Sequence, residues 1–281
     1  MRNLVAFVCL IALSLSMAAC AFDSASSVQP ATGYVAESSE NAHAGFGKII
    51  VFEDYGLSVT LENIRYESRS TEFDFSIENS SDDNATLFGT TFIVNGVMID
   101  TFLYAPVASG AKANCTLYFD SADLGTAGIK EIYSIVSYDS YISFEKSENK
   151  DISLDIMFTE EKTQNIDYSG KTLYDQNGIT VISKFDSSKQ PDNIPLLVMN
   201  ESGQDFNIWT EYVTVNGYTV PEWHYSYIVC DGSVRFFEIE LVGPDMGGAD
   251  INTIETASFT LDFKVPGSST SICKTEQLEI Q

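Results

Sequence analysis

The chain contains the segment Phe92-Ile93-Val94-Asn95-Gly96, and 121 residues further on it contains Val213-Thr214-Val215-Asn216-Gly217. In both segments an Asn-Gly pair lies between two apolar runs. This pattern is typical of a type I′ β-hairpin, because both central residues of that turn need a positive φ, which asparagine and glycine tolerate. The sequence therefore predicts the same hairpin twice.

Other short segments recur with the same spacing of 121 or 122 residues. Similarity between unrelated β-rich segments would not keep its register over such a distance, so we interpret the chain as a duplicated domain. Asn79 and Asn200 each end a strand and open a polar loop, where an asparagine side chain can mimic a turn. Gly56 and Gly178 fit turns that come directly before a strand. The recurring segments are Tyr55-Gly56-Leu57-Ser58-Val59 with Asn177-Gly178-Ile179-Thr180-Val181, Ile77-Glu78-Asn79 with Val198-Met199-Asn200, Asp123-Leu124-Gly125 with Asp245-Met246-Gly247, and Ile129 and Ile132 with Ile251 and Ile254.

The folded part of the chain has the pattern of a mainly β protein. Residues 73–78 and 258–265 alternate apolar and polar side chains, which is typical of strands with one buried face. Only a short helix is expected, near Ser121–Leu124. Each copy has roughly 100 to 110 residues and several short strands, which favours two tandem immunoglobulin-like β-sandwiches. Small β-barrels remain an alternative.

The N-terminus has the three parts of an export signal. Arg2 is followed by an apolar run from Leu4 to Leu15 and then by Met17-Ala18-Ala19-Cys20. The apolar run is shorter than the ~20 residues that a membrane-spanning helix needs. The last four residues resemble the bacterial lipobox, and that resemblance implies a lipid on Cys20. An ordinary secretory signal cut near Ala19 is the alternative.

These features divide the chain into consecutive segments. The Ser- and Ala-rich stretch after the signal is expected to be a flexible tether, since it has no periodicity. The predicted segments are a signal peptide over residues 1–19, a tether over 20–47, repeat one over 48–158, a linker over 159–173, repeat two over 174–266 and a C-terminal tail over 267–281.

The charge of the chain excludes several classes of partner. Forty acidic and 15 basic residues give a net charge of −25. Nucleic acids and anionic lipid surfaces are bound through clustered lysine and arginine, so neither is an expected partner. An acidic surface of this kind keeps an exported protein soluble.

The cysteines give no sign of a metal site. Cys9 leaves with the signal, and the folded part contains Cys115, Cys230 and Cys273. Without a Cys-x-x-Cys pair a zinc cage has no support. Cys230 and Cys273 can pair in an oxidising compartment, or all three can be free thiols.

No residue pattern points to an enzyme. A Ser/His/Asp triad would have to use His224, and no Gly-x-Ser-x-Gly elbow accompanies it. Calcium takes oxygen ligands from acidic loops, so it is the one metal considered, at residues 81–84, 120–123 and 245–250. None of these loops has EF-hand spacing. We therefore expect no catalytic residue and no required cofactor.

The residues singled out for ligand binding are aromatic. Trp209, Trp223, Tyr225 and Tyr227 flank the second Val-Asn-Gly hairpin. Exposed aromatic rings on a sandwich can stack on sugars or fill a pocket of a partner. Packing of the core and the hairpin is the alternative role. The matching places in repeat one, such as Gly89 and Phe102, do not form an equal cluster.

Three segments of repeat one carry a resemblance to a known family. Residues 75–79 (Phe-Ser-Ile-Glu-Asn), Val94-Asn95-Gly96 and Gly110-Ala111-Lys112 resemble the telokin-like, immunoglobulin-like modules of Gram-positive lipoproteins, most of which have no assigned function. Repeat two departs from that pattern at Met199, where an acidic residue is usual, and at residues 231–233. The resemblance implies an envelope sandwich with an accessory or binding role, and it transfers no catalytic residue.

These observations lead to one expected function and two alternatives. The expected function is that of a non-enzymatic lipoprotein, anchored through its lipid on the extracellular face of the cell membrane, that binds an envelope, host or glycan partner. The first alternative is a scaffold lipoprotein whose edge strands pair with other envelope components. The second is a carbohydrate-active or calcium-dependent enzyme.

Overall fold

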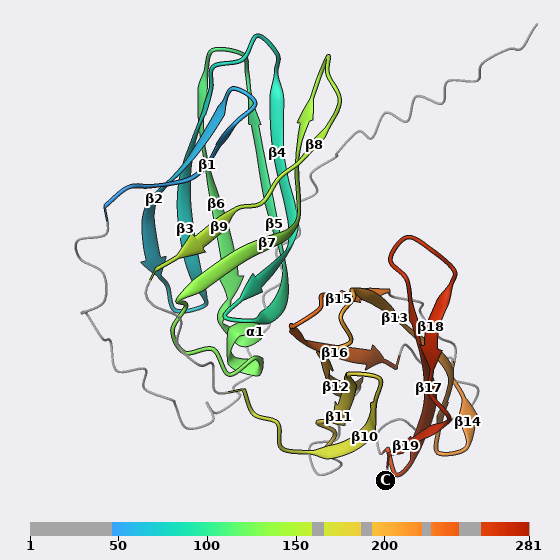
Figure 1. The fold of residues 1–281 in the computed structure, drawn as a ribbon. Coiled ribbons are helices and arrows are strands. Elements are labelled where there is room, and N and C mark those ends of the chain that lie inside the picture. The colour runs from blue at the N-terminus through green and yellow to red at the C-terminus, as the bar shows by residue number, and fades with distance from the viewer. Residues whose placement is uncertain (1–46, 159–165, 187–192, 221–225, 242–253, 281) are drawn as a thin grey trace, which may run out of the picture. The chain divides into compact units, whose positions relative to one another are not determined.

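The fold consists of two β-sandwiches that follow one another along the chain (Figure 1). The computed structural model describes residues 47–158, 166–186, 193–220, 226–241 and 254–280. We call the sandwich of residues 47–158 module 1 and that of residues 166–280 module 2. This architecture confirms the predicted mainly β class. Within the described residues no helix is long and apolar enough to cross a membrane.

Module 1 has nine strands and one short helix. The prediction of a helix near Ser121–Leu124 is confirmed, and the carboxylate of Asp120 caps it by accepting from the backbone of Ala122. The elements are β1 (Ile49–Asp54), β2 (Leu57–Tyr66), β3 (Ser70–Asn79), β4 (Ala85–Val94), β5 (Val97–Val107), β6 (Lys112–Asp120), α1 (Ser121–Thr126), β7 (Ser134–Phe144), β8 (Lys150–Asp151) and β9 (Asp155–Met157).

Module 2 repeats this order strand by strand, except that two short strands, β14 and β15, occupy the place of β5. Its elements are β10 (Lys171–Gln176), β11 (Ile179–Ser183), β12 (Asn193–Asn200), β13 (Phe206–Val215), β14 (Tyr218–Thr219), β15 (Tyr227–Val229), β16 (Val234–Glu240), β17 (Ala257–Lys264), β18 (Ser271–Lys274) and β19 (Leu278–Ile280).

Each module encloses its core between two sheets. In module 1 one sheet has the order β1-β2-β3-β6, and in the other β4 lies between β5 and β7 while β8 and β9 both pair with β7. Module 2 has the corresponding order β10-β11-β12-β16, and a second sheet in which β13 pairs with β14, β15 and β17. The chain crosses between the sheets after β3 and β12, which gives both modules the same Greek-key connection.

The alternating sequence explains the cores. Along β3 the side chains of Thr71, Phe73, Phe75 and Ile77 are buried, while those between them are partly exposed. Strands with a period of two place alternate residues on opposite faces. The apolar face of β3 therefore meets the other sheet of the sandwich, where Leu87 is fully buried.

The predicted Asn-Gly hairpins are confirmed. Asn95 and Gly96 have φ values of 53° and 85°, and Asn216 and Gly217 have 50° and 82°. The Oδ1 of Asn95 accepts from the backbone N–H groups of residues 133 and 134. The Oδ1 of Asn216 accepts in the same way from residues 255 and 256. The duplicated sequence thus produces duplicated hydrogen bonds.

Gly56 and Gly178 stand at further hairpin turns of the same kind, between β1 and β2 and between β10 and β11. Their φ values are 78° and 73°, and the residues before them also have positive φ. The prediction that both glycines belong to turns before a strand is confirmed.

Gly178 allows the strongest test of this turn geometry. An added Cβ there would lie 2.5 Å from the carbonyl oxygen of Glu201, whereas at Gly217 it would meet nothing within 4 Å. We expect Gly217→Ala to lose about 1–2 kcal/mol of stability, the cost of a left-handed conformation. Gly178→Ala should lose a further ~1–3 kcal/mol from the backbone overlap. Urea unfolding followed by tryptophan fluorescence measures both, and equal losses would contradict the geometry.

Two predicted boundaries are wrong. The linker was expected to extend to residue 173, but β10 starts at Lys171. The tail was separated from repeat two, but β18 and β19 lie within it and both pair with β17. They complete the sheet as β8 and β9 do beside β7 in module 1. Without them the edge of β17 would carry unpaired backbone groups.

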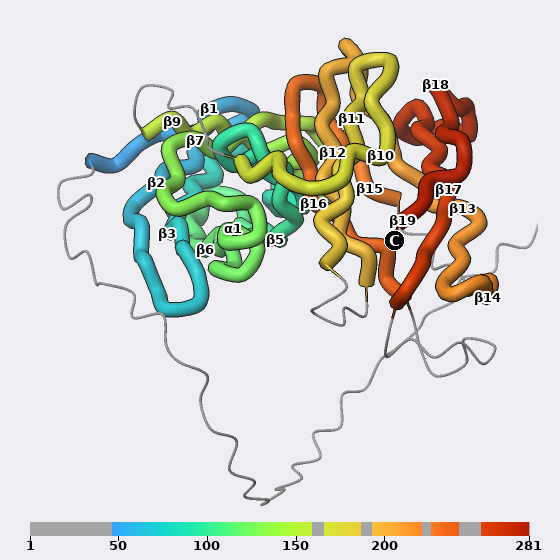
Figure 2. The backbone as a smooth tube through the Cα atoms, turned by 90° about the horizontal axis from the view of Figure 1, so that it is seen from below, coloured from blue at the N-terminus to red at the C-terminus, as the bar shows by residue number. Residues whose placement is uncertain are grey.

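The two modules meet through one end of the β5-β4-β7 sheet. The strands β16 and β5 pair in parallel at Val234↔Val97 and Arg235↔Met98, where the two segments lie next to each other in Figure 2. Met98 is buried in the core of module 2, and its sulfur accepts from the backbone N–H of Cys230 at 3.2 Å. Module 2 thus covers part of the outer face of this module 1 sheet.

Candidate binding site

The aromatic residues predicted in repeat two do not form one surface. Trp209 and Tyr227 are described, while Trp223 and Tyr225 lie outside the described residues. Tyr227 pairs with the buried Ile208, so it occupies the face opposite to that of Trp209. A binding role for this set stays a prediction, but no single ligand can lie across Trp209 and Tyr227.

Each of these two rings has a contact that explains its position. The Tyr227 ring lies 5.1 Å from the guanidinium carbon of Arg235 and 5.6 Å from the ring of Phe237. The buried Arg235 also forms an ion pair with Asp100 of module 1. On the outer face of β13, the Nζ of Lys264 lies 4.7 Å from the centre of the Trp209 ring. Tyr227 therefore supports the contact between the modules.

A cavity of about 290 Å³ adjoins Arg235. Tyr227, Asp100 and Asp123 are among its lining residues. The pKa of Asp123 is raised, first by burial and then by the nearby charges of Asp120 and Asp100. This cavity belongs to the contact between the modules, where Arg235 offsets part of the acidic charge.

A contiguous group of aromatic side chains lies on the outer face of module 1, where the sequence did not place it. Phe88 on β4, Phe102 and Tyr104 on β5, and Tyr141 on β7 form what we call the aromatic patch. The register pairs Phe88 with both Tyr104 and Tyr141, so these three rings form a row across neighbouring strands. Side chains directly opposite one another on adjacent strands share a face.

The four rings of the aromatic patch are in continuous contact. The centroids of Phe88 and Tyr141 are 4.9 Å apart in a stacked pair, and those of Phe88 and Tyr104 are 5.2 Å apart edge to face. Phe102 and Tyr104 are nearly parallel at 6.2 Å. Phe102 is 53% exposed and Tyr104 is 50% exposed. None of the four side chains belongs to either core or packs against one. The rings therefore pack against one another on the surface of module 1.

The patch continues the face that module 2 covers. Met98 lies on β5 and Ile93 on β4, and both contact the core of module 2. The Tyr138 hydroxyl on β7 donates to Asp205 of module 2 at 2.8 Å. The same three strands carry the aromatic patch further along, beyond these contacts. One end of the face is thus buried against module 2, and the other end presents its rings to solvent.

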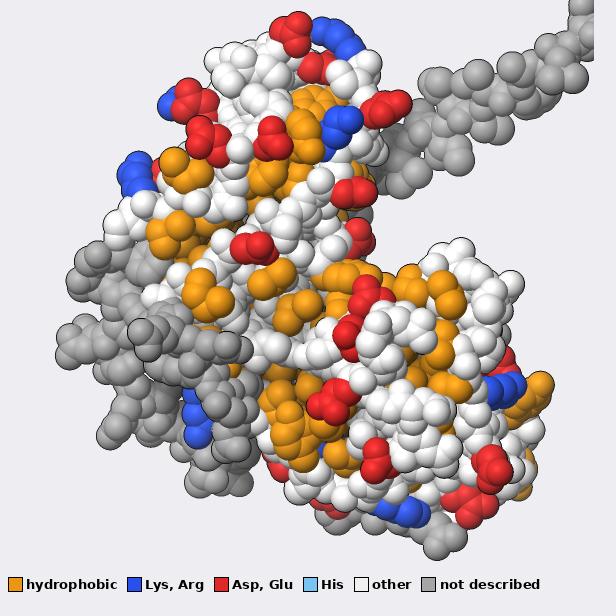
Figure 3. Space-filling view, viewed as in Figure 1, with side chains coloured by type: hydrophobic (Ala, Val, Ile, Leu, Met, Phe, Trp, Pro, Cys, Tyr) orange, Lys and Arg blue, Asp and Glu red, His pale blue; other side chains and the backbone are white. Residues whose placement is uncertain are grey.

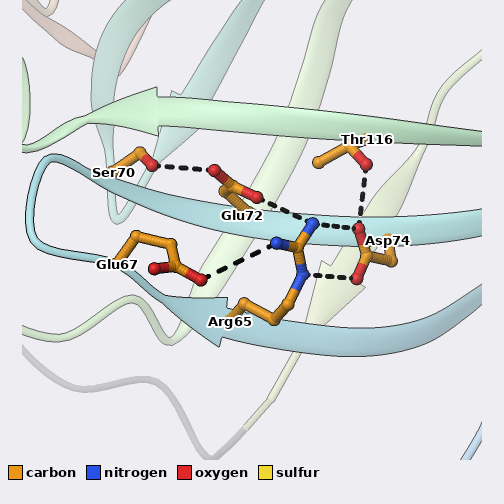
Figure 4. Close-up of polar contacts among 6 residues, drawn as sticks. All are labelled: Arg65, Glu67, Ser70, Glu72, Asp74 and Thr116. Carbon is orange, nitrogen blue, oxygen red and sulfur yellow. Dashed lines mark hydrogen bonds and ion pairs between the residues drawn. The ribbon is translucent and has the colours of Figure 1, made fainter.

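The opposite outer face of module 1 is charged. On the sheet of β2, β3 and β6, Arg65 forms hydrogen bonds of 2.8 Å to both carboxylate oxygens of Asp74 and an ion pair with Glu72 (Figure 4). The hydrogen bond from Arg65 lowers the pKa of Asp74. Thr116 donates to the same carboxylate. The charges of these side chains are paired with one another, so this face is an ordinary polar surface in contact with water.

The acidic loops considered for calcium have other partners where they are described. Asp83 accepts through Oδ2 from the backbone of Lys146 and the hydroxyl of Ser147, and Asp120 caps α1. Residues 245–250 and His224 lie outside the described residues. Within the described part of the chain, no group of three or more histidine, cysteine or acidic side chains is arranged to hold a metal ion.

The three cysteines of the two modules are free thiols, so Cys230 and Cys273 are not paired. Burial raises the pKa of the Cys230 thiol to about 12 and that of Cys115 to about 11. At neutral pH both therefore lack the thiolate form that reacts as a nucleophile.

The comparisons with known proteins do not identify a family for this chain. No family model matches the chain, and no curated protein matches it. Among solved structures, a transglutaminase from red sea bream is similar over 76% of this chain and 30% of its own length, with 7% sequence identity and a TM-score of 0.22. A likeness at that level carries no argument about activity.

Proposed function

We propose that this protein is a non-enzymatic, lipid-anchored surface lipoprotein that binds a partner through the aromatic patch of module 1. Cys20 carries the anchor, and residues 20–47 hold the modules away from the membrane. The modules are of the telokin-like, immunoglobulin-like kind. The observation that supports the binding role is the continuous contact of four aromatic rings outside both cores.

Rings in such a position favour binding for two physical reasons. Exposed apolar surface that is contiguous costs free energy in water, and large patches of this kind mark interaction sites. Tyrosine and phenylalanine also give a large contact area while few side-chain torsions are fixed, so they contribute strongly to the affinity of interfaces. The contacts among Phe88, Tyr104 and Tyr141 hold the row in place before a partner arrives.

Replacing two of the rings tests this function. The double variant Phe102→Ala/Tyr104→Ala should keep its fold, since both side chains are half exposed and outside the cores. Tyr118→Ala is the matched control, because Tyr118 is 52% exposed and lies on β6, in the other sheet of the same module. Immobilised protein is mixed with solubilised native envelope, and the captured components are quantified.

We expect the double variant to lose at least 90% of the specific capture, a tenfold drop that corresponds to about 1.4 kcal/mol. Tyr118→Ala should capture as much as the parent protein. Equal capture by the double variant and the parent would contradict a binding role for the aromatic patch.

A further inference from the structure

The duplication allows the outer faces of the two modules to be compared position by position. On β4, Phe88 pairs with Tyr141, and at the same place on β13, Trp209 pairs with Asp262. Two residues along, Ser143 on β7 corresponds to Lys264 on β17. Each module thus has an aromatic ring at the same position of the same strand.

In module 2 this ring is covered by a cation of the chain itself. The Nζ of Lys264 lies 4.7 Å from the centre of the Trp209 ring and 3.3 Å from a carboxylate oxygen of Asp262. An ammonium group over an aromatic face is attracted by the negative face of the ring, and a neighbouring carboxylate strengthens its hold.

Among the described residues, two other lysines also lie over aromatic rings. Lys274 lies 5.2 Å from the ring centre of Tyr212, and Lys150 lies 6.0 Å from that of Tyr55. By contrast, the described residues place no lysine or arginine over the four rings of the aromatic patch. The serine at position 143 is too short to do in module 1 what Lys264 does in module 2.

The surroundings of the patch are acidic. The exposed Asp139 accepts from the hydroxyl of Thr90 at 2.8 Å, and the exposed Asp151 is the β8 partner of Tyr141. The whole chain carries 40 acidic against 15 basic residues, and acidic side chains lie beside hydrophobic ones across the face drawn in Figure 3. Such a field attracts cationic partners and repels anionic ones.

We infer that the aromatic patch binds lysine side chains of a basic peptide segment on a protein partner. The partner's ammonium groups lie over the rings of Tyr104 and Phe102, and the carboxylates of Asp139 and Asp151 attract them. The aliphatic stem of each lysine covers apolar ring surface. This inference rests on the proposed function and names the chemistry of the partner.

The test uses a fluorescent peptide of six lysines as the probe and the same peptide with acetylated Nε atoms as its control, because acetylation removes the charge and leaves the stem. Binding to the chain carrying Cys20→Ser is measured by fluorescence anisotropy at 150 mM salt, where long-range attraction is screened. The Phe102→Ala/Tyr104→Ala variant keeps the net charge of the chain. A loss of peptide binding in this variant therefore reports the ring contacts and not the acidic charge of the surface.

We expect the lysine peptide to bind at least tenfold more tightly than the acetylated one. Each cation–ring contact contributes about 0.5–1 kcal/mol at an exposed site, so the double variant should bind the lysine peptide about fivefold to thirtyfold more weakly. Tyr118→Ala should bind it like the parent. Equal affinity for the two peptides, or an unchanged affinity of the double variant, would overturn the inference.

The exchange of one residue gives an independent test. Ser143→Lys places a lysine where Lys264 stands in module 2, so its ammonium group should lie over Phe88, the ring paired with Tyr104. There it should repel the ammonium groups of the peptide and weaken peptide binding by about threefold or more. Ser143→Gln matches part of the added bulk without the charge and should leave binding within twofold. Equal effects of the two variants would count against a cation at this position.

A neutral hexasaccharide of N-acetylglucosamine separates this inference from the proposed function. If that sugar binds in a manner that needs Tyr104 while the lysine peptide does not, the inference fails and the proposed function stands. The capture experiment decides the proposed function separately: if the Phe102→Ala/Tyr104→Ala variant captures the same envelope components as the parent, the proposed function fails.

Discussion

Replacing Asn200 with alanine should lower the free energy of unfolding of module 2 by about 3 kcal/mol, because polar backbone groups that this side chain satisfies would be buried without a partner. Asn200 is fully buried. Its Nδ2 donates to the carbonyl oxygens of Gln204 and Val229, both at 2.9 Å. Its Oδ1 accepts from the backbone N–H of Ser202 at 3.0 Å and from the Ser202 hydroxyl at 2.7 Å. Alanine provides none of these contacts.

The same reasoning applies to Asn79 in module 1. Its amide donates to the carbonyl oxygens of Asp83 and Val107, and its Oδ1 accepts from the backbone and the hydroxyl of Ser81. Asn79→Ala should therefore destabilise module 1 by a similar amount. Each asparagine connects the loop after its own strand to a strand of the other sheet.

The measurement is urea unfolding. Both tryptophans of the chain, Trp209 and Trp223, lie in repeat two, so tryptophan fluorescence follows module 2. Gln176→Ala is the control, since Gln176 is an exposed residue of module 2 and such substitutions change stability by within ~0.5 kcal/mol. If Asn200→Ala unfolded within that range of the parent, the buried asparagine would not stabilise the loop as the hydrogen bonds indicate.

Replacing Cys20 with serine should move the protein from the membrane fraction to the soluble exported fraction. A serine hydroxyl does not accept the lipid that the lipobox cysteine receives. Buried acyl chains contribute about 0.8 kcal/mol for each CH₂ group, so their loss removes the anchor altogether. Fractionation after a high-salt wash, followed by immunoblotting, measures the distribution.

Cys9→Ser is the matched control for this experiment. Cys9 lies within the predicted signal, which is removed, so this variant should stay in the membrane fraction like the parent. Retention of the Cys20→Ser variant in the membrane fraction would show that the protein is held there by something other than a lipid on Cys20.

The turns could be predicted from the sequence, because their geometry depends on the conformational preferences and hydrogen bonds of a few neighbouring residues. Asn95-Gly96 and Asn216-Gly217 form the predicted turns because few other residue pairs tolerate two consecutive positive φ values. Asn79 mimics a turn, as predicted, because its short amide reaches the backbone two residues on. The spacing of these residues then predicted the duplication, which the strands of the two modules follow, apart from β5, whose place β14 and β15 occupy.

The aromatic patch could not be predicted in the same way. Phe88, Tyr104 and Tyr141 are far apart in the sequence, and only the register of β4, β5 and β7 brings them into one row. One local signal was present: Phe102 and Tyr104 are two residues apart, which places both on one face of a strand. The sequence pointed to repeat two for the aromatic cluster because Trp209 and Tyr227 are both close to the second hairpin. In the structure these two residues lie on opposite faces of the sheet.

The contact between the modules also could not be predicted from local sequence patterns. The parallel pairing of β16 with β5 covers only two residue pairs. Arg235 is buried because Asp100, which comes from the other module, neutralises its charge. Neither partner has a sequence neighbourhood that distinguishes it from the exposed charges elsewhere in the chain.

The measurement that tests the central claim most directly is photo-crosslinking in intact cells. The photoreactive amino acid p-benzoylphenylalanine replaces Tyr104 in one variant and Tyr118 in another, two tyrosines of similar exposure on opposite faces of module 1. A binding surface at the aromatic patch predicts a discrete crosslinked product from position 104 and none from position 118. The same product from both positions, or a product from position 118 alone, would contradict it.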